Sequence, residues 1–158
     1  MARHYVTFGG TIAASTIIMF GLMYLNTYQL DHVFFSQTRA WMALLMGATM
    51  AAIMLTAMRG MYRSARLNVL IYGASVVVFA AALWLVRSQA TVGDVAWMKA
   101  MIPHHSIAIL TSERARITDP RVRALADGII ETQRKEIGEM KRLIADLETS
   151  HPRGALGD

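Results

Sequence analysis

The sequence predicts an all-α membrane protein: three transmembrane helices followed by an extramembrane antiparallel helical hairpin. Three observations predict this fold class. The chain holds three long uncharged runs, its charge density rises sharply after the third run, and two helical segments joined by a short turn follow. Of the 158 residues, 54% are hydrophobic and only 17% are charged. We therefore expect a three-span anchor at 1–88, a helical hairpin at 89–150 and a mobile tail at 151–158.

The uncharged runs occupy residues 8–26, 40–58 and 67–86. Each is about 20 residues long, which is the length that a helix needs to cross the hydrocarbon core of a bilayer. A helix in a water-soluble core is rarely apolar on every face over that distance. The first run lacks a small-x-small cleavage site before the chain turns polar, so we interpret it as a retained span instead of a signal peptide.

The charge distribution predicts an orientation. Residues 59–68 hold three arginines and no acid, as expected for a cytoplasmic loop, whereas residues 27–39 are nearly neutral. We expect a bacterial inner-membrane protein with a cytoplasmic N-terminus and a periplasmic hairpin. Since much of the net charge of +5 lies in that loop, it does not predict a nucleic-acid partner. The chain has no cysteine, so disulfides and thiolate metal sites are excluded.

The hairpin is predicted from turn signals and periodicity. The spacing from Thr91 to Asp94 is that of a capping box, and a helix from about 92 to 117 is expected to kink or split at Pro103. Asp119 and Pro120 then predict the start of a second helix that ends near 149. The apolar stripe of this second helix comprises Val122, Leu125, Ile129, Ile130, Ile137, Met140, Leu143, Ile144 and Leu147.

A two-helix hairpin buries little surface by itself. Either it packs on the membrane anchor, or two copies pair into a four-helix bundle. The second arrangement hides both apolar stripes, so we favour a homodimer.

Both predicted helices carry metal-ligating atoms on one face. The residues are Asp94, Met98, Met101 and His105 on the first helix, and Gln133, Glu136 and Met140 on the second. In an antiparallel hairpin centred near 118–119, Met98 would lie level with Met140, His105 with Gln133, and Met101 with Glu136. Thioether, imidazole and carboxylate groups would then converge between the helices.

Such a strip favours a soft metal ion. Neutral thioethers select Cu(I) or Ag(I), and Glu136 could serve as a ligand or could orient a histidine. Zinc structural sites usually use cysteine, and the oxygen ligands are too few for calcium. The alternative interpretation is structural, because methionine at helical spacing commonly fills a core. Spacing alone leaves both interpretations open.

The motif from Met98 to His105 (MKAMIPHH) and the motif from Gln133 to Met140 (QRKEIGEM) carry a family resemblance. Residues 91–148 resemble domain-of-unknown-function family 305, which includes the CopM-like copper-binding proteins, and the upstream part resembles its membrane-anchored branch. The resemblance implies a ferritin-like helical arrangement, of which this chain supplies half of a four-helix bundle. It also implies copper or silver binding by Met98, Met101, His104, His105 and Met140, with Asp94, Gln133 and Glu136 as weaker candidates.

Methionines also recur every fourth residue in the second span, from Met42 to Met58. A row with this step winds around the helix, so we favour packing over a relay of thioethers for Cu(I). At the outer end of the spans, His32, Asp31 and Met42 form a weaker second candidate metal site.

We expect a membrane-tethered periplasmic Cu(I)- or Ag(I)-binding protein in copper homeostasis or resistance, with membrane lipid, a second copy and copper-handling proteins as partners. One alternative is a non-catalytic scaffold whose hairpin dimerises or docks a partner. A second alternative is a ferritin-like metal redox enzyme. No catalytic constellation occurs, and the Glu-x-x-His pair of di-iron sites is missing, so we do not expect an enzyme.

Overall fold

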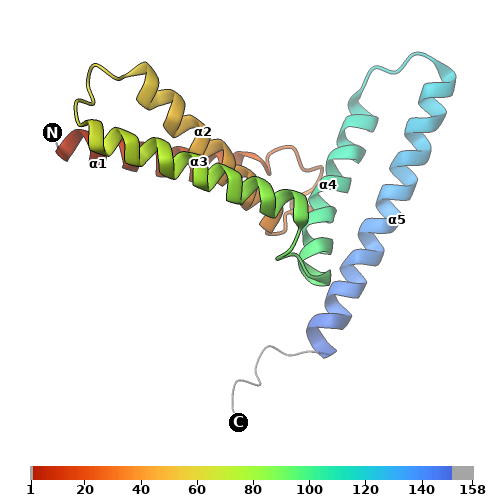
Figure 1. Cartoon of the computed structure of the whole chain (residues 1–158). Coiled ribbons are helices and arrows are strands. Elements are labelled where there is room, and N and C mark those ends of the chain that lie inside the picture. Colours follow the sequence, from red (N-terminus) through yellow and green to blue (C-terminus); the bar gives the residue numbers. More distant parts are fainter. Residues whose placement is uncertain (1, 151–158) are drawn as a thin grey trace, which may run out of the picture. The chain divides into compact units, whose positions relative to one another are not determined.

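The computed structural model describes residues 2–150, and this part of the chain is helical throughout its regular structure, with no strand (Figure 1). The elements are α1 (Ala2–Leu22), the short 3-10 helix η1 (Leu30–His32), α2 (Gln37–Ala57), α3 (Ala65–Ser88), α4 (Asp94–Arg114) and α5 (Pro120–Ser150). They form two compact units. Among the described residues, the anchor unit joins 2–23 to 37–91, and the hairpin unit joins 24–36 to 92–150. The tail expected at 151–158 lies outside the described residues.

The anchor unit consists of α1, α2 and α3. All three helices are long and apolar enough to cross a membrane, over Arg3–Leu22, Gln37–Ala57 and Ala65–Ser88. The helix α2 packs against both α1 and α3. Its contact with α1 is close: a β-carbon added at Gly47 would collide with the hydroxyl of Thr16. Small residues at such crossings are typical of helix packing in membranes, where backbones approach each other closely.

Aromatic and polar side chains hold the start of α1 to the loop between α2 and α3. The ring of Tyr62 lies 5.1 Å from that of Tyr5 and 5.3 Å from that of Phe8, measured between centroids. The hydroxyl of Tyr5 donates a 2.8 Å hydrogen bond to Oδ1 of Asn68 and accepts one of 3.1 Å from the backbone N–H of Ser64. The loop between α2 and α3, and the first turn of α3, are therefore fixed to the start of α1.

The hairpin unit is built on the antiparallel helices α4 and α5 (Figure 1). The predicted N-cap is confirmed: Oδ1 of Asp119 accepts hydrogen bonds from the backbone N–H groups of Arg121 (2.8 Å) and Val122 (3.4 Å). The two helices share one buried apolar cluster, formed by Met98, Ile102, Ile109, Ile130, Ile137, Met140 and Ile144. Ion pairs between Lys99 and Glu148 and between Arg134 and Glu113 join the helices at the edges of this cluster.

Three predictions about the hairpin need correction. The helix α4 begins at Asp94 with Gly93 as N-cap and no side-chain cap, so Thr91 does not form the expected capping box. Of the two expected effects of Pro103, a kink or a split, the split does not occur, since Pro103 lies inside the continuous helix α4. The predicted stripe on α5 is too wide: Val122 and Leu125 are 49% and 65% exposed, and Leu143 and Ile129 are also exposed.

The segment 24–36, which connects α1 to α2 in sequence, packs on the hairpin. Tyr28 and Phe34 contact the apolar cluster of α4 and α5. The backbone N–H of Tyr28 donates a 2.7 Å hydrogen bond to the hydroxyl of Ser106 on α4, and Lys141 on α5 donates one of 2.6 Å to Asp31. From the sequence we expected the hairpin to pack on the anchor or to pair with a second copy. The structure shows in addition that the segment 24–36 packs on the hairpin.

Candidate metal centre

Two of the predicted methionines lie in the core between α4 and α5. Met98 is 5% exposed and Met140 is 6% exposed, and both belong to the apolar cluster of the hairpin unit. Met101, one turn after Met98 on α4, is partly buried and packs against the same cluster. Met98, Met101 and Met140 therefore all belong to, or pack against, one apolar cluster of the hairpin unit.

A polar group lies beside these methionines. Nε2 of His105 lies 3.2 Å from Oε2 of Glu136, so α4 and α5 are joined by an imidazole–carboxylate contact. Nε2 of Gln133 donates a long hydrogen bond of 3.5 Å to the same carboxylate oxygen. The sequence predicted His105 opposite Gln133; the contact that forms is with Glu136, one turn further along α5. Glu136 thus connects the histidine to the glutamine.

The other ring nitrogen of His105 lies in the buried part of the hairpin unit. Its Nδ1 atom is buried and makes no hydrogen bond of normal geometry within residues 2–150. Burial lowers the pKa of His105, and His104 acts in the same direction, whereas the Glu136 carboxylate and the Met101 carbonyl oppose this shift. At neutral pH the ring is therefore uncharged. With the Nε2 proton directed at Glu136, the lone pair of the imidazole is on Nδ1.

His104 and Asp94 lie at the margin of this region. His104 is exposed, and its ring centroid is 6.3 Å from that of His105. Asp94 is exposed as the first residue of α4, where it lines a shallow hollow together with Met98. In the part of the chain that the structure describes, no three His, Asp or Glu side chains gather closely enough to hold a metal ion. A metal centre here therefore depends on the methionines.

Asp31 and His32 of the weaker second site are engaged in other contacts, and Met42 belongs to the other unit. His32 is 7% exposed, and its Nδ1 lies 3.0 Å from the hydroxyl of Ser106. Asp31 pairs with Lys141, and its other carboxylate oxygen lies 3.9 Å from Nε2 of His32. Met42 belongs to α2 in the anchor unit, whereas Asp31 and His32 belong to the hairpin unit.

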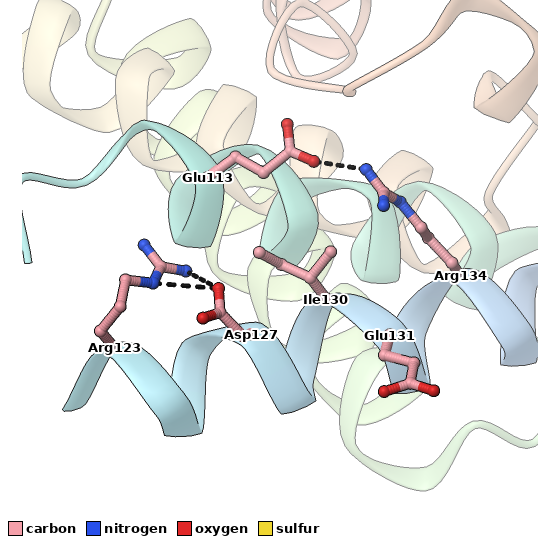
Figure 2. A pocket seen from close by; sticks show the side chains of 6 residues that line it. All are labelled: Glu113, Arg123, Asp127, Ile130, Glu131 and Arg134. Atoms are coloured by element: carbon pink, nitrogen blue, oxygen red, sulfur yellow. Dashed lines mark hydrogen bonds and ion pairs between the residues drawn. The ribbon is translucent and has the colours of Figure 1, made fainter. Parts of the chain in front are cut away.

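A second hollow of about 520 Å³ lies near the turn of the hairpin (Figure 2). Its charged lining is largely paired: Arg134 contacts Glu113, and Arg123 contacts Asp127 at 2.7 Å. Arg123 also donates a hydrogen bond to the carbonyl of Ser112, which ties the start of α5 to the end of α4. We infer that these contacts hold the end of α4 against the start of α5 at the turn of the hairpin.

Ser106 is the important residue that sequence reasoning missed. Its side chain is completely buried, and its hydroxyl meets both the Tyr28 backbone and the His32 ring from a segment more than seventy residues away. A partial signal was present, since Tyr24, Tyr28, Phe34 and Phe35 make the segment 24–36 unusually aromatic for a solvated loop. That signal indicates a buried segment but does not identify its partner.

The comparisons with known proteins concern the C-terminal part of the chain. Residues 94–155 match the family described as Domain of unknown function (DUF305). An uncharacterized protein of Acanthamoeba polyphaga mimivirus is 41% identical over 64 residues, which is 39% of this chain. The match spans only 42% of that relative's length. No solved structure matches the chain.

We predict that acid destabilises the hairpin unit through His32. Burial, with a smaller effect of Lys141, lowers the pKa of His32 below its usual 6.5, although Asp31 opposes the shift. The unfolded chain therefore takes up the proton first, and stability that is fully present above pH 6.5 is lost as the pH falls. The measurement is the thermal unfolding midpoint of the full chain in detergent, followed from about pH 7.5 to 5.5.

The matched variants are His32→Asn, which keeps an acceptor near Nδ1 without titrating, and His4→Asn at an exposed position of the anchor unit. We expect a shallower pH dependence for His32→Asn than for wild type and for His4→Asn. Equal slopes for wild type and His32→Asn would contradict the assignment.

Proposed function

The C-terminal part of this chain belongs to the DUF305 family over residues 94–155, and on that premise we propose a membrane-tethered protein that binds Cu(I) or Ag(I). The ion is held between α4 and α5 and is sequestered or passed on to copper-handling proteins. The observation that carries the proposal is the buried, unpartnered Nδ1 of His105 on the same hairpin as the clustered thioethers.

The proposed ligands are Nδ1 of His105 and the thioethers of Met98, Met101 and Met140. All four are neutral at pH 7, which suits a soft monovalent ion in a region of low polarity. A divalent ion would bring a second charge into this core with only Glu136 close to the imidazole to balance it. Methionine side chains are flexible, so the sulfur atoms can turn toward an ion without a change in the backbone. His104, exposed beside His105, is placed to receive the ion from solvent.

Glu136 is proposed as the residue that orients His105. A carboxylate that accepts the Nε2 proton fixes the tautomer and raises the basicity of the opposite nitrogen. The distance of 3.2 Å between Nε2 and the carboxylate supports this role, and Gln133 in turn restrains the carboxylate. Because the ligands are uncharged above the pKa of His105, binding Cu(I) displaces no proton there, and affinity falls only when the imidazole becomes protonated.

We place the hairpin on the periplasmic side of a bacterial inner membrane. The support is the run of three arginines between α2 and α3, which favours the cytoplasm for that loop. The hairpin is separated from this loop by one span and would lie on the opposite side. There, the ligands meet ions that have not yet entered the cytoplasm.

A double variant, Met98→Leu with His105→Ala, tests the metal centre. We expect the purified wild-type chain to retain Cu(I) or Ag(I) after dialysis under reducing conditions, and the variant to lose it, because a thioether and the imidazole are both removed. Metal content is measured by elemental analysis. The matched control is Met61→Leu with His4→Ala, which changes the same residue types at exposed positions of the anchor unit. Equal retention by all three proteins would refute the proposed site.

The role of Glu136 is tested by Glu136→Gln, compared with Glu139→Gln one turn away on the exposed face of α5. Loss of a residue that orients a ligand typically weakens metal binding by about 10- to 100-fold. We expect this loss in Cu(I) affinity for Glu136→Gln, measured by competition with a chromogenic Cu(I) chelator. The affinity of Glu139→Gln should stay at the wild-type value. A full loss of binding in Glu136→Gln would instead make the carboxylate a direct ligand.

One observation favours a second candidate function, a scaffold whose hairpin pairs with another copy. Val122, Leu125 and Ile129 form an exposed apolar row on α5, with no partner among the described residues. We expect the detergent-solubilised chain to form a dimer that Leu125→Glu converts to a monomer, as measured by sedimentation equilibrium. Lys135→Glu, an exposed change on another face of α5, should leave the dimer intact. A wild-type chain that is monomeric at every concentration would rule out this pairing.

A further inference from the structure

The anchor unit carries positive charge with no acidic side chain to balance it. Residues 1–23 and 37–91 contain six arginines and no aspartate or glutamate: Arg3, Arg39, Arg59, Arg63, Arg66 and Arg87. Arg59, Arg63 and Arg66 lie in or directly after the loop between α2 and α3, and all three are exposed. They form no ion pair within residues 2–150. No acidic side chain of the anchor unit is present to pair with them.

The same unit has an apolar groove on its surface. The helices α1 and α3 each pack along α2. They meet each other directly near the start of both helices, where Tyr5 bonds Asn68. Between them lies an open groove of about 500 Å³, with the small residues Gly47, Ala48 and Ala51 of α2 among its lining. The lining is almost entirely apolar, and its hydroxyl groups are those of Thr16 and Ser75. The hydroxyl of Thr16 is already bonded to the Ile12 carbonyl at 2.8 Å.

One end of the groove lies at the arginine-rich loop. Phe8 lines the groove and also packs edge-to-face on Tyr62, which directly precedes Arg63. Ala51, another lining residue, belongs to the same apolar cluster as Phe8 and Tyr62. The hydrogen bonds of Tyr5 to Ser64 and Asn68 fix the loop at this place. A molecule in the groove can thus extend an anionic group to the arginines.

We propose that the groove and the three arginines form a binding site for one anionic phospholipid. An acyl chain lies in the groove between α1 and α3, and the phosphate headgroup binds Arg59, Arg63 and Arg66. Basic clusters at the end of an inter-helix cavity recognise anionic headgroups in this way, since guanidinium groups pair with phosphate oxygens. A second copy of the chain fits less well, because the anchor unit of that copy has no acidic side chain to offer these arginines.

The headgroup half of the site is tested by native mass spectrometry of the full chain in mild detergent. The chain is offered phosphatidylglycerol or phosphatidylcholine with identical acyl chains. We expect retention of one phosphatidylglycerol with a preference of at least about tenfold over phosphatidylcholine. The variant Arg59→Gln/Arg63→Gln/Arg66→Gln should lose this preference. A charge-matched control, Arg114→Gln/Arg116→Gln/Arg142→Gln in the hairpin unit, should keep it.

The groove half is tested with two adjacent glycines of α1. Gly9 lines the groove and Gly10 does not, and a β-carbon at either position meets no neighbouring atom within 4 Å. Gly9→Leu should fill the groove and reduce retained phosphatidylglycerol at least about tenfold, whereas Gly10→Leu should retain it like wild type. Equal retention of both lipids by wild type, or no effect of the triple arginine variant, overturns the proposal. So does a Gly9→Leu variant that keeps the lipid but loses a dimer, because the groove would then hold a helix of a second copy.

Discussion

The buried contact between α4 and α5 is the interaction on which the hairpin unit depends. Ile102 and Ile109 of α4 are completely buried against the apolar residues of α5, and this cluster aligns the two helices. Met98 and Met140 belong to the same cluster, so the candidate ligands also contribute to the core. Packing and the proposed metal binding thus use the same side chains. Thioethers allow this double use, since they are apolar enough for a core and still soft donors.

The polar contacts of the hairpin unit are arranged around this apolar contact. Ser106 lies on the buried side of α4, where an unpaired hydroxyl would be unfavourable, and the segment 24–36 supplies its partners. His105, the preceding residue, directs its ring to Glu136 on α5. His105 therefore connects α4 to α5, and the next residue, Ser106, connects α4 to the segment 24–36. The orientation of His105 is restrained from both sides: by α5 directly, and by the docked segment through the backbone.

The sequence predicted the helices well because their signals are local. The uncharged runs gave all three long apolar helices, and Asp119 marked the start of α5 to within one residue. The sequence predicted less well which side of each helix faces the core, because this depends on the rotation of the helix about its axis. Val122 and Leu125 have the right period for the core but are exposed, and His105 contacts Glu136 instead of Gln133. The docking of 24–36 on α4 and α5 could not be predicted, since a hydrogen bond between positions 28 and 106 leaves no periodic pattern.

The docked segment has a consequence for how the chain is made. Asp31 and Lys141 are 110 residues apart in sequence, and α2 and α3 are synthesised between them. Two spans separate the segment 24–36 from α4, so both reach the same side of the bilayer only if each span has been inserted in its proper direction. A chain with one span misplaced leaves Tyr28 and Ser106 on opposite faces of the membrane, and the hairpin unit cannot complete its core. Because these late contacts join distant parts of the chain, they form after membrane insertion is finished. The hairpin unit therefore completes its core only when the segment 24–36 and the helices α4 and α5 lie on the same side of the membrane.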